Sequence, residues 1–131
     1  MPTAQTCTIT EETFGTIKKV KWVWIATDAG IVTTSAVAGL NPQTTNVYSG
    51  EIIRLVTIPA GTTSAPDDNY NVYVYDDDDT DVLMGGGATR DTANTEQVLG
   101  TSLGCVANDK LELGITAAGD ANGGTVILYI R

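Results

Sequence analysis

Residues 16–27, which read TIKKVKWVWIAT, decide the fold class of this chain. Alternate side chains of the stretch share a face: Val20, Trp22 and Trp24 on one side, and Lys19, Lys21, Val23 and Ile25 on the other. A period of two residues is typical of a β-strand with one face toward a core. We therefore expect the two tryptophans to anchor the core. The second face, basic at one end and apolar at the other, is expected to reach a contact surface.

The same alternation recurs in short segments along the rest of the chain. Gly, Pro, Asn and Asp residues, which are typical of turns, separate these segments. Besides residues 16–27, strands are predicted over residues 31–37, 47–58, 69–75, 81–83, 110–116 and 125–131. Residues 96–99 are predicted as a short strand, with one helical turn as the alternative. No long helical pattern interrupts them. We therefore expect one all-β domain over residues 1–131, a β-sandwich or jelly-roll-like barrel of about eight mostly antiparallel strands.

The charge of the chain argues against several classes of partner. Acidic residues number 16 and basic residues 7, which gives a net charge of −9. A nucleic-acid binder needs a basic face for the phosphates, and an anionic lipid surface repels an acidic chain in the same way. Neither nucleic acid nor a membrane is therefore an expected partner. The polar, Thr-rich residues 1–13 contain no basic segment followed by an apolar stretch, so no secretory signal is expected.

The composition also argues against an enzyme. The chain has no histidine, which removes the commonest general base and the commonest metal ligand. Carboxylates such as Glu51, Glu96 and Glu112 are available, but nothing in their spacing places two of them across a cleft. We expect neither an enzymatic activity nor a bound cofactor.

An acidic segment forms the expected turn of a hairpin that spans residues 69–83. Asp77, Asp79 and Asp81 alternate in this segment, and several carboxylate oxygens are what calcium requires. The segment lacks the glycine and the distal glutamate of an EF-hand loop. Two other interpretations stay open, namely a solvated turn, which is the simpler one, and an acidic knob that docks on a basic surface.

The two cysteines of the chain, Cys7 and Cys105, leave two alternatives open. They form one disulfide if the terminal strands are neighbours. Otherwise they are two buried thiols that act as small hydrophobic residues, which is the favoured interpretation.

Several turn and strand segments, taken in order, resemble a group of small structural proteins of tailed bacteriophages. The segments are YSGEIIRLVT (48–57), DNY (68–70), DVL (81–83), RDTANTE (90–96), ANDKL (107–111) and LYIR (128–131). The resemblance implies a virion component, most simply a capsid decoration or cement protein that is made in the host cytoplasm and lies on the capsid surface. The implied partner is the major capsid protein. The chain would bind it as a homo-oligomer such as a trimer, or as many copies on the lattice.

Two other functions remain alternatives to capsid decoration. One is a tail, neck or fibre component of the virion, because the resemblance does not separate head from tail. The other is a carbohydrate-binding, adhesive module that uses exposed Trp or Tyr side chains. A cement role requires a contact surface, and we predict that Lys18, Lys19, Lys21 and Arg54 contribute to it.

Overall fold

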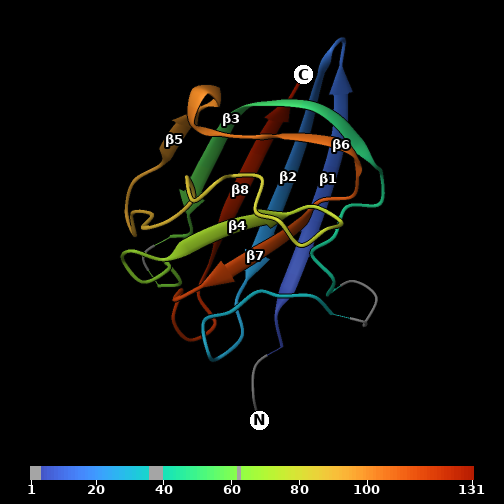
Figure 1. The fold of residues 1–131 in the computed structure, drawn as a ribbon. Coiled ribbons are helices and arrows are strands. Elements are labelled where there is room, and N and C mark those ends of the chain that lie inside the picture. Colours follow the sequence, from blue (N-terminus) through green and yellow to red (C-terminus); the bar gives the residue numbers. More distant parts are fainter. Residues whose placement is uncertain (1–3, 36–39, 62) are drawn as a thin grey trace.

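The computed structural model describes residues 4–35, 40–61 and 63–131, and these residues form eight strands and one short 3₁₀ helix. The strands are β1 (Thr6–Phe14), β2 (Ile17–Ile25), β3 (Tyr48–Pro59), β4 (Asn71–Tyr75), β5 (Glu96–Leu99), β6 (Cys105–Asp109), β7 (Glu112–Thr116) and β8 (Gly123–Ile130), and the helix is η1 (Gly100–Ser102). The all-β prediction is confirmed (Figure 1). Within the described ranges, no helix is long and apolar enough to cross a membrane.

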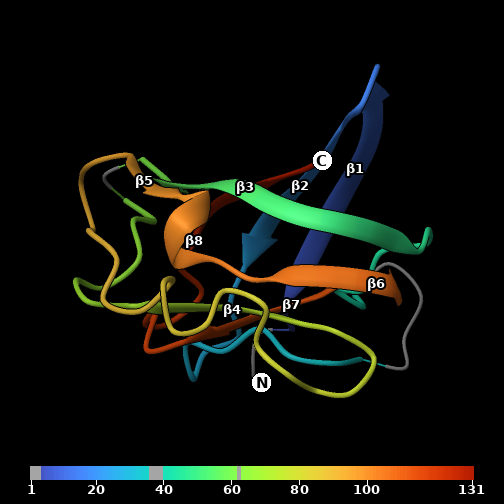
Figure 2. The same ribbon diagram turned by 45° about the horizontal axis from the view of Figure 1, so that its top comes forward.

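The strands form two sheets that pack face to face. The large sheet has the order β1-β2-β8-β3-β5, with β6 paired to another part of β3, and the small sheet consists of β4 and β7. Every strand pairing in both sheets is antiparallel. The small sheet lies across one face of the large sheet, and β6 closes one end of the layered structure (Figures 1 and 2). No strand of residues 4–35, 40–61 and 63–131 covers the opposite face of the large sheet (Figure 2), and we call it the outer face.

The core lies between the two sheets, as the pattern of residues 16–27 predicts. Trp22 and Trp24 of β2 are 0% and 1% exposed, which confirms that both tryptophans anchor the core. The indole Nε1 of Trp22 donates a hydrogen bond of 2.8 Å to the carbonyl oxygen of Pro42. The ring of Trp24 packs against Tyr70 at a centroid distance of 5.8 Å. The small sheet contributes buried apolar side chains from both of its strands: Val72, Val74, Leu113 and Ile115.

Two predicted strands are wrong, although the number of strands is close to the expectation. In the segment predicted as residues 31–37, Val32 forms an isolated bridge with Ile115 in place of a strand, and residues 36 and 37 lie outside the described residues. Residues 81–83 do not form the return strand of a hairpin: β4 pairs with β7 on one edge, and on its other edge it meets residues 81–90 only through isolated contacts. Asp81 bridges Tyr75 and Val82 donates to the carbonyl oxygen of Val74, and the chain then turns away.

Two strands of the structure escaped the sequence analysis. The β1 strand pairs with β2 along its whole length, and β6 pairs with the first part of β3. Both strands are poor in apolar residues, since most of their side chains face solvent. Hydrogen bonds to the backbone of the neighbouring strand stabilise a strand of this kind. It therefore needs few apolar side chains, and its hydrophobic pattern is weak.

Candidate functional site

The outer face gathers three of the four predicted contact residues. Directly opposite residues of an antiparallel pair project from the same side of the sheet. Lys19 on β2 lies opposite Tyr129 on β8, and Tyr129 lies opposite Arg54 on β3. Lys21 lies opposite Ile127 in the neighbouring row. Strands from distant parts of the chain thus bring three cationic side chains to one surface.

The ring of Tyr129 contacts two of these cations. The Cζ atom of Arg54 lies 5.1 Å from the centre of this ring, and the Nζ atom of Lys19 lies 6.0 Å from the same centre. Both distances are within the range of a cation–π interaction. The Nε group of Arg54 also donates a hydrogen bond of 2.9 Å to the side-chain oxygen of Gln97 on β5. The ring and the amide together hold the guanidinium along the sheet surface.

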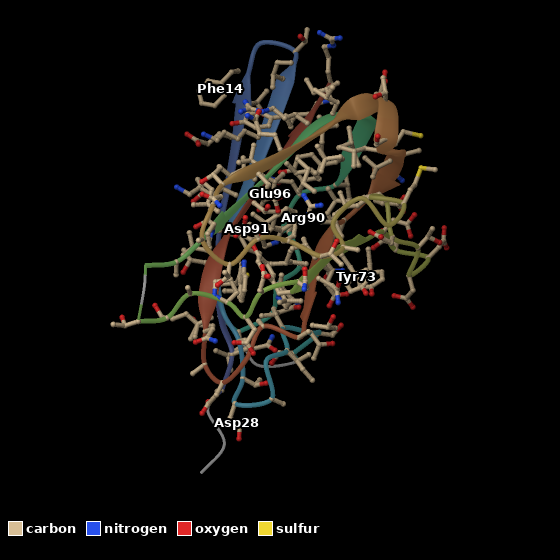
Figure 3. All side chains as sticks on the ribbon, turned by 90° about the vertical axis from the view of Figure 1, so that its left-hand side faces the viewer. Phe14, Asp28, Tyr73, Arg90, Asp91 and Glu96 are labelled. Carbon is tan, nitrogen blue, oxygen red and sulfur yellow. The ribbon has the colours of Figure 1, made fainter. Side chains whose placement is uncertain are left out.

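Apolar side chains lie beside these cations. Val23 and Ile25 continue the outward side of β2 and are each 44% exposed. Phe14, at the tip of the β1–β2 hairpin, is also exposed, and Figure 3 shows its side chain on the opposite side of the molecule from Tyr73. Exposed apolar groups with a basic border are typical of a surface that binds another protein.

Lys18, the fourth predicted contact residue, does not belong to the outer face. It lies opposite Ile130, which is fully buried, so the side chain leaves the sheet on the inner side. Its Nζ group donates a hydrogen bond of 2.9 Å to the carbonyl oxygen of Ser49. The prediction for Lys18 is therefore corrected, because adjacent residues of a strand point to opposite faces.

The acidic turn does not assemble the predicted calcium ligands. Among the described residues, no group of three His, Cys, Asp or Glu side chains is placed to hold a metal ion. The Asp77 carboxylate accepts a hydrogen bond from the backbone N–H of Lys110, whereas Asp81 turns toward the chain that follows it. Asp79 sits in the left-handed region of backbone space with φ at 59°. These three carboxylates form no such group, so the structure gives no support to the calcium site, which stays a prediction.

Asp81 has a structural role in place of a metal ligand. Its Oδ1 atom accepts hydrogen bonds of 3.1 Å from the N–H groups of Val74 and Leu83, and its Oδ2 atom accepts one of 3.1 Å from Gly85. Three backbone donors thus occupy the carboxylate. This arrangement also explains why the predicted hairpin stops at residue 81, since the side chain takes the place of a further strand pairing.

The two cysteines do not form a disulfide. Cys7 and Cys105 are free thiols on β1 and β6, two strands that pair with different neighbours. Cys7 is buried, and burial raises the pKa of its thiol to about 12. Cys105 is exposed, so the alternative of two buried thiols holds for Cys7 alone.

The RDTANTE segment that supports the bacteriophage resemblance forms a locked turn beside β5. The Oε1 atom of Glu96 accepts a hydrogen bond of 2.8 Å from the N–H of Asp91 and lies 3.7 Å from the guanidinium of Arg90. Asp91 accepts a hydrogen bond of 2.8 Å from the N–H of Ala93, and this bond lowers the pKa of its carboxyl group. Figure 3 shows Arg90, Asp91 and Glu96 close together on the side of the molecule. The side chains of this segment therefore stabilise the turn that leads into β5.

A groove on the outward side of the small sheet is a feature that the sequence analysis missed. It has a volume of about 320 Å³ and is lined by Tyr73 and Tyr75 of β4 and by Glu112 of β7, among others. Tyr73 and Tyr75 alternate with the buried Val72 and Val74 along β4, so both project from the outward face. Residues 31–34 also line the groove. They belong to the segment that was predicted as a strand over residues 31–37.

Comparisons with known proteins identify no relative of this chain. No family model matches it, and neither a curated protein nor a solved structure is significantly similar to it.

Proposed function

We propose that the chain is a structural protein of a tailed-bacteriophage virion, and that it decorates the capsid through its outer face. The observation that carries the proposal is the gathering of three cations on the outer face: Lys19 and Arg54 at the ring of Tyr129, and Lys21 in the next row, beside the exposed Val23 and Ile25. The resemblance of the turn and strand segments to small bacteriophage structural proteins supports it. The partner is the major capsid protein.

The charge distribution supports a docking role for this face. The chain carries a net charge of −9, yet three of its 7 basic residues project from one side of one sheet. A basic patch attracts an acidic partner surface and orients the encounter, while the apolar groups beside it lose water on contact. We therefore expect the complementary capsid surface to be acidic around an apolar centre.

A weak contact suffices for a decoration protein because the lattice repeats it. Binding sites that are linked in one oligomer raise the effective concentration of each remaining contact, so total binding is tighter than any single contact. An oligomer of this chain, such as a trimer, would use its outer faces in this way. Light scattering of the purified protein measures the number of copies.

The test is co-sedimentation of the protein with capsids from the phage that encodes it, after the endogenous protein has been stripped. We expect the Lys19→Gln/Lys21→Gln variant to lose at least about tenfold in affinity, since each desolvated charge contact contributes of the order of 1 kcal/mol or more. Lys18→Gln is the matched control, because it removes a lysine of the same strand that projects to the other side. It should bind like the unmodified protein.

Three results would contradict the proposal. If Lys18→Gln weakened binding as much as the double variant, the outer face would not be the contact. Binding to purified tails but not to capsids would favour the tail, neck or fibre alternative. Absence of the protein from purified virions would reject a structural role in the particle altogether.

A further inference from the structure

The groove on the small sheet lies on the side of the molecule that faces away from the proposed capsid contact, and Tyr73 marks its position in Figure 3. Two tyrosines of β4, all five residues of β7, Asp79 and the segment 31–34 line it. The chemically informative lining residues are Thr34, Tyr73, Tyr75, Asp79, Glu112 and Gly114.

The aromatic wall of the groove is two parallel rings. Tyr73 and Tyr75 have ring centroids 5.8 Å apart and an angle of 14° between their planes. Gly114 lies directly opposite Tyr73 on β7, and a Cβ atom at this position would lie 2.8 Å from Cε2 of Tyr75. The absence of a side chain at residue 114 therefore leaves the space in which the Tyr75 ring lies close to the sheet. Both rings remain partly exposed to solvent.

The groove is anionic. Asp79 and Glu112 line it, while none of the chain's 7 basic residues does, and all of these residues lie in the described ranges. Burial raises the pKa of the Tyr75 hydroxyl, and the negative charges of Asp81, Glu112 and Asp79 raise it further. Glu112 is held in place by a hydrogen bond from the hydroxyl of Thr34. The aromatic rings thus lie in a region of negative potential.

We propose that this groove binds a cationic group, either an ammonium or a guanidinium, against the faces of Tyr73 and Tyr75 and beside Glu112 and Asp79. An aromatic face attracts a cation, and the attraction grows when water is displaced. A carboxylate adds a charge-assisted hydrogen bond, which a guanidinium can make in bidentate form. The same potential excludes phosphate, sulfate and acidic sugars. The cation can belong to an arginine or lysine side chain, a polyamine or an amino sugar.

The test is a titration of the ¹⁵N-labelled protein with argininamide, spermidine and glucosamine, followed by amide chemical shifts. We expect saturable shifts in residues 73–75 and 112–116. N-acetylcitrullinamide and N-acetylglucosamine, which carry no ionisable amine, are neutral counterparts of argininamide and glucosamine. The shifts should show that they bind at least about tenfold more weakly, since a charged hydrogen bond is stronger than a neutral one by this order. The probe that binds most tightly shows whether the cationic group belongs to a side chain such as arginine, to a polyamine or to an amino sugar.

Variants separate the groove from the rest of the surface. Glu112→Gln and Tyr75→Leu should each weaken argininamide binding several-fold, while Tyr75→Phe keeps the aromatic face and should retain it. Glu12→Gln and Tyr129→Leu are matched controls, because both residues lie on the outer face. Circular dichroism confirms that each variant is folded.

Two outcomes would overturn the inference. Equal shifts with N-acetylglucosamine and glucosamine would mean that the rings stack on neutral sugars and that charge is not recognised. No shift in residues 73–75 and 112–116 with any of the three cations at tens of millimolar would mean that the groove is not a cation site. Neither outcome depends on whether the outer face binds a capsid.

Discussion

Arg54 and Tyr129 are direct cross-strand partners on β3 and β8, and the Cζ atom of Arg54 lies 5.1 Å from the centre of the Tyr129 ring. A β-bulge between Ile52 and Arg54 precedes this pair, since the register of β3 against β8 shifts there. An extra residue in one strand re-aims the side chains that follow it. Ile52 therefore enters the core, whereas Arg54 joins Lys19 on the outer face.

The two buried tryptophans differ in their hydrogen bonding, and this difference predicts different costs of replacement. Trp22 donates to the Pro42 carbonyl, while the indole N–H of Trp24 has no hydrogen-bond partner among the described residues. Trp22→Phe removes one of the two hydrogen bonds to this carbonyl, since the backbone N–H of Leu113 donates the other at 3.2 Å. The loss of one hydrogen bond costs about 0.5–1.5 kcal/mol beyond the loss of volume. We expect Trp22→Phe to lower the free energy of unfolding by about this amount more than Trp24→Phe does. Urea denaturation of both variants measures the difference, and equal losses would contradict the prediction.

Gly50 allows the end of β8 to approach β3. Its φ is 139°, and a Cβ atom there would lie 2.6 Å from the carbonyl oxygen of Arg131. Gly50→Ala should therefore destabilise the protein by about 1–3 kcal/mol, because both the backbone conformation and the contact are strained. Gly61→Ala is the control, since a Cβ atom at this position meets nothing within 4 Å. Its melting temperature should stay close to that of the unmodified protein, and a similar loss in both variants would refute the explanation.

Asp81 is predicted to stabilise the fold without calcium. Asp81→Ala leaves the N–H groups of Val74, Leu83 and Gly85 without their acceptor and should cost about 1–3 kcal/mol. Asp78→Ala is the control in the same turn, because Asp78 is exposed. Neither calcium nor EDTA should change the melting temperature, since a ligand stabilises a protein only where the native state binds it. A rise of the melting temperature with calcium would restore the metal site.

The two thiols should differ in reactivity. A thiol reacts as the thiolate, and burial of Cys7 raises its pKa to about 12, whereas Cys105 is exposed. We expect one thiol per chain to react with Ellman's reagent at pH 8 in the native protein and two in denaturant. Cys105→Ser should remove the native reaction. A native protein with no reactive thiol, and two after reduction, would indicate the disulfide that the structure lacks.

The raised pKa of the Tyr48 hydroxyl leads us to expect a loss of stability at alkaline pH. The hydroxyl donates a hydrogen bond of 2.8 Å to the Glu11 carboxylate, and burial together with this bond raises its pKa above the usual value of 10.0. The unfolded chain ionises Tyr48 near pH 10, while the folded chain keeps it protonated. The contribution of Tyr48 to the free energy of unfolding is therefore complete below pH 10 and is lost as the pH rises above 10. Tyr48→Phe should show a shallower decline of unfolding free energy from pH 9 to 11, and an unchanged slope would contradict this assignment.

The sequence by itself determined the fold class and most of the core. Residues 16–27 place Trp22 and Trp24 on one face because side chains alternate along an extended chain, and the structure buries both. The same rule separates Lys19 and Lys21 from Lys18, although the sequence analysis grouped the three. The segments 69–75, 110–116 and 125–131 also alternate strongly enough to be recognised as strands, and residues 47–58 are recognised by apolar side chains on both faces.

The tertiary structure alone decided which strands are neighbours, and with them both candidate sites. Arg54 meets Tyr129 because β3 pairs with β8, a contact between residues far apart in the chain. Glu112 meets Tyr75 because β4 pairs with β7, whereas local spacing had favoured a hairpin with residues 81–83. Strand partners are selected by the burial of a whole sheet face and by hydrogen bonds between distant segments. A periodic pattern records which side of a strand is buried and carries no information about the strand that lies beside it.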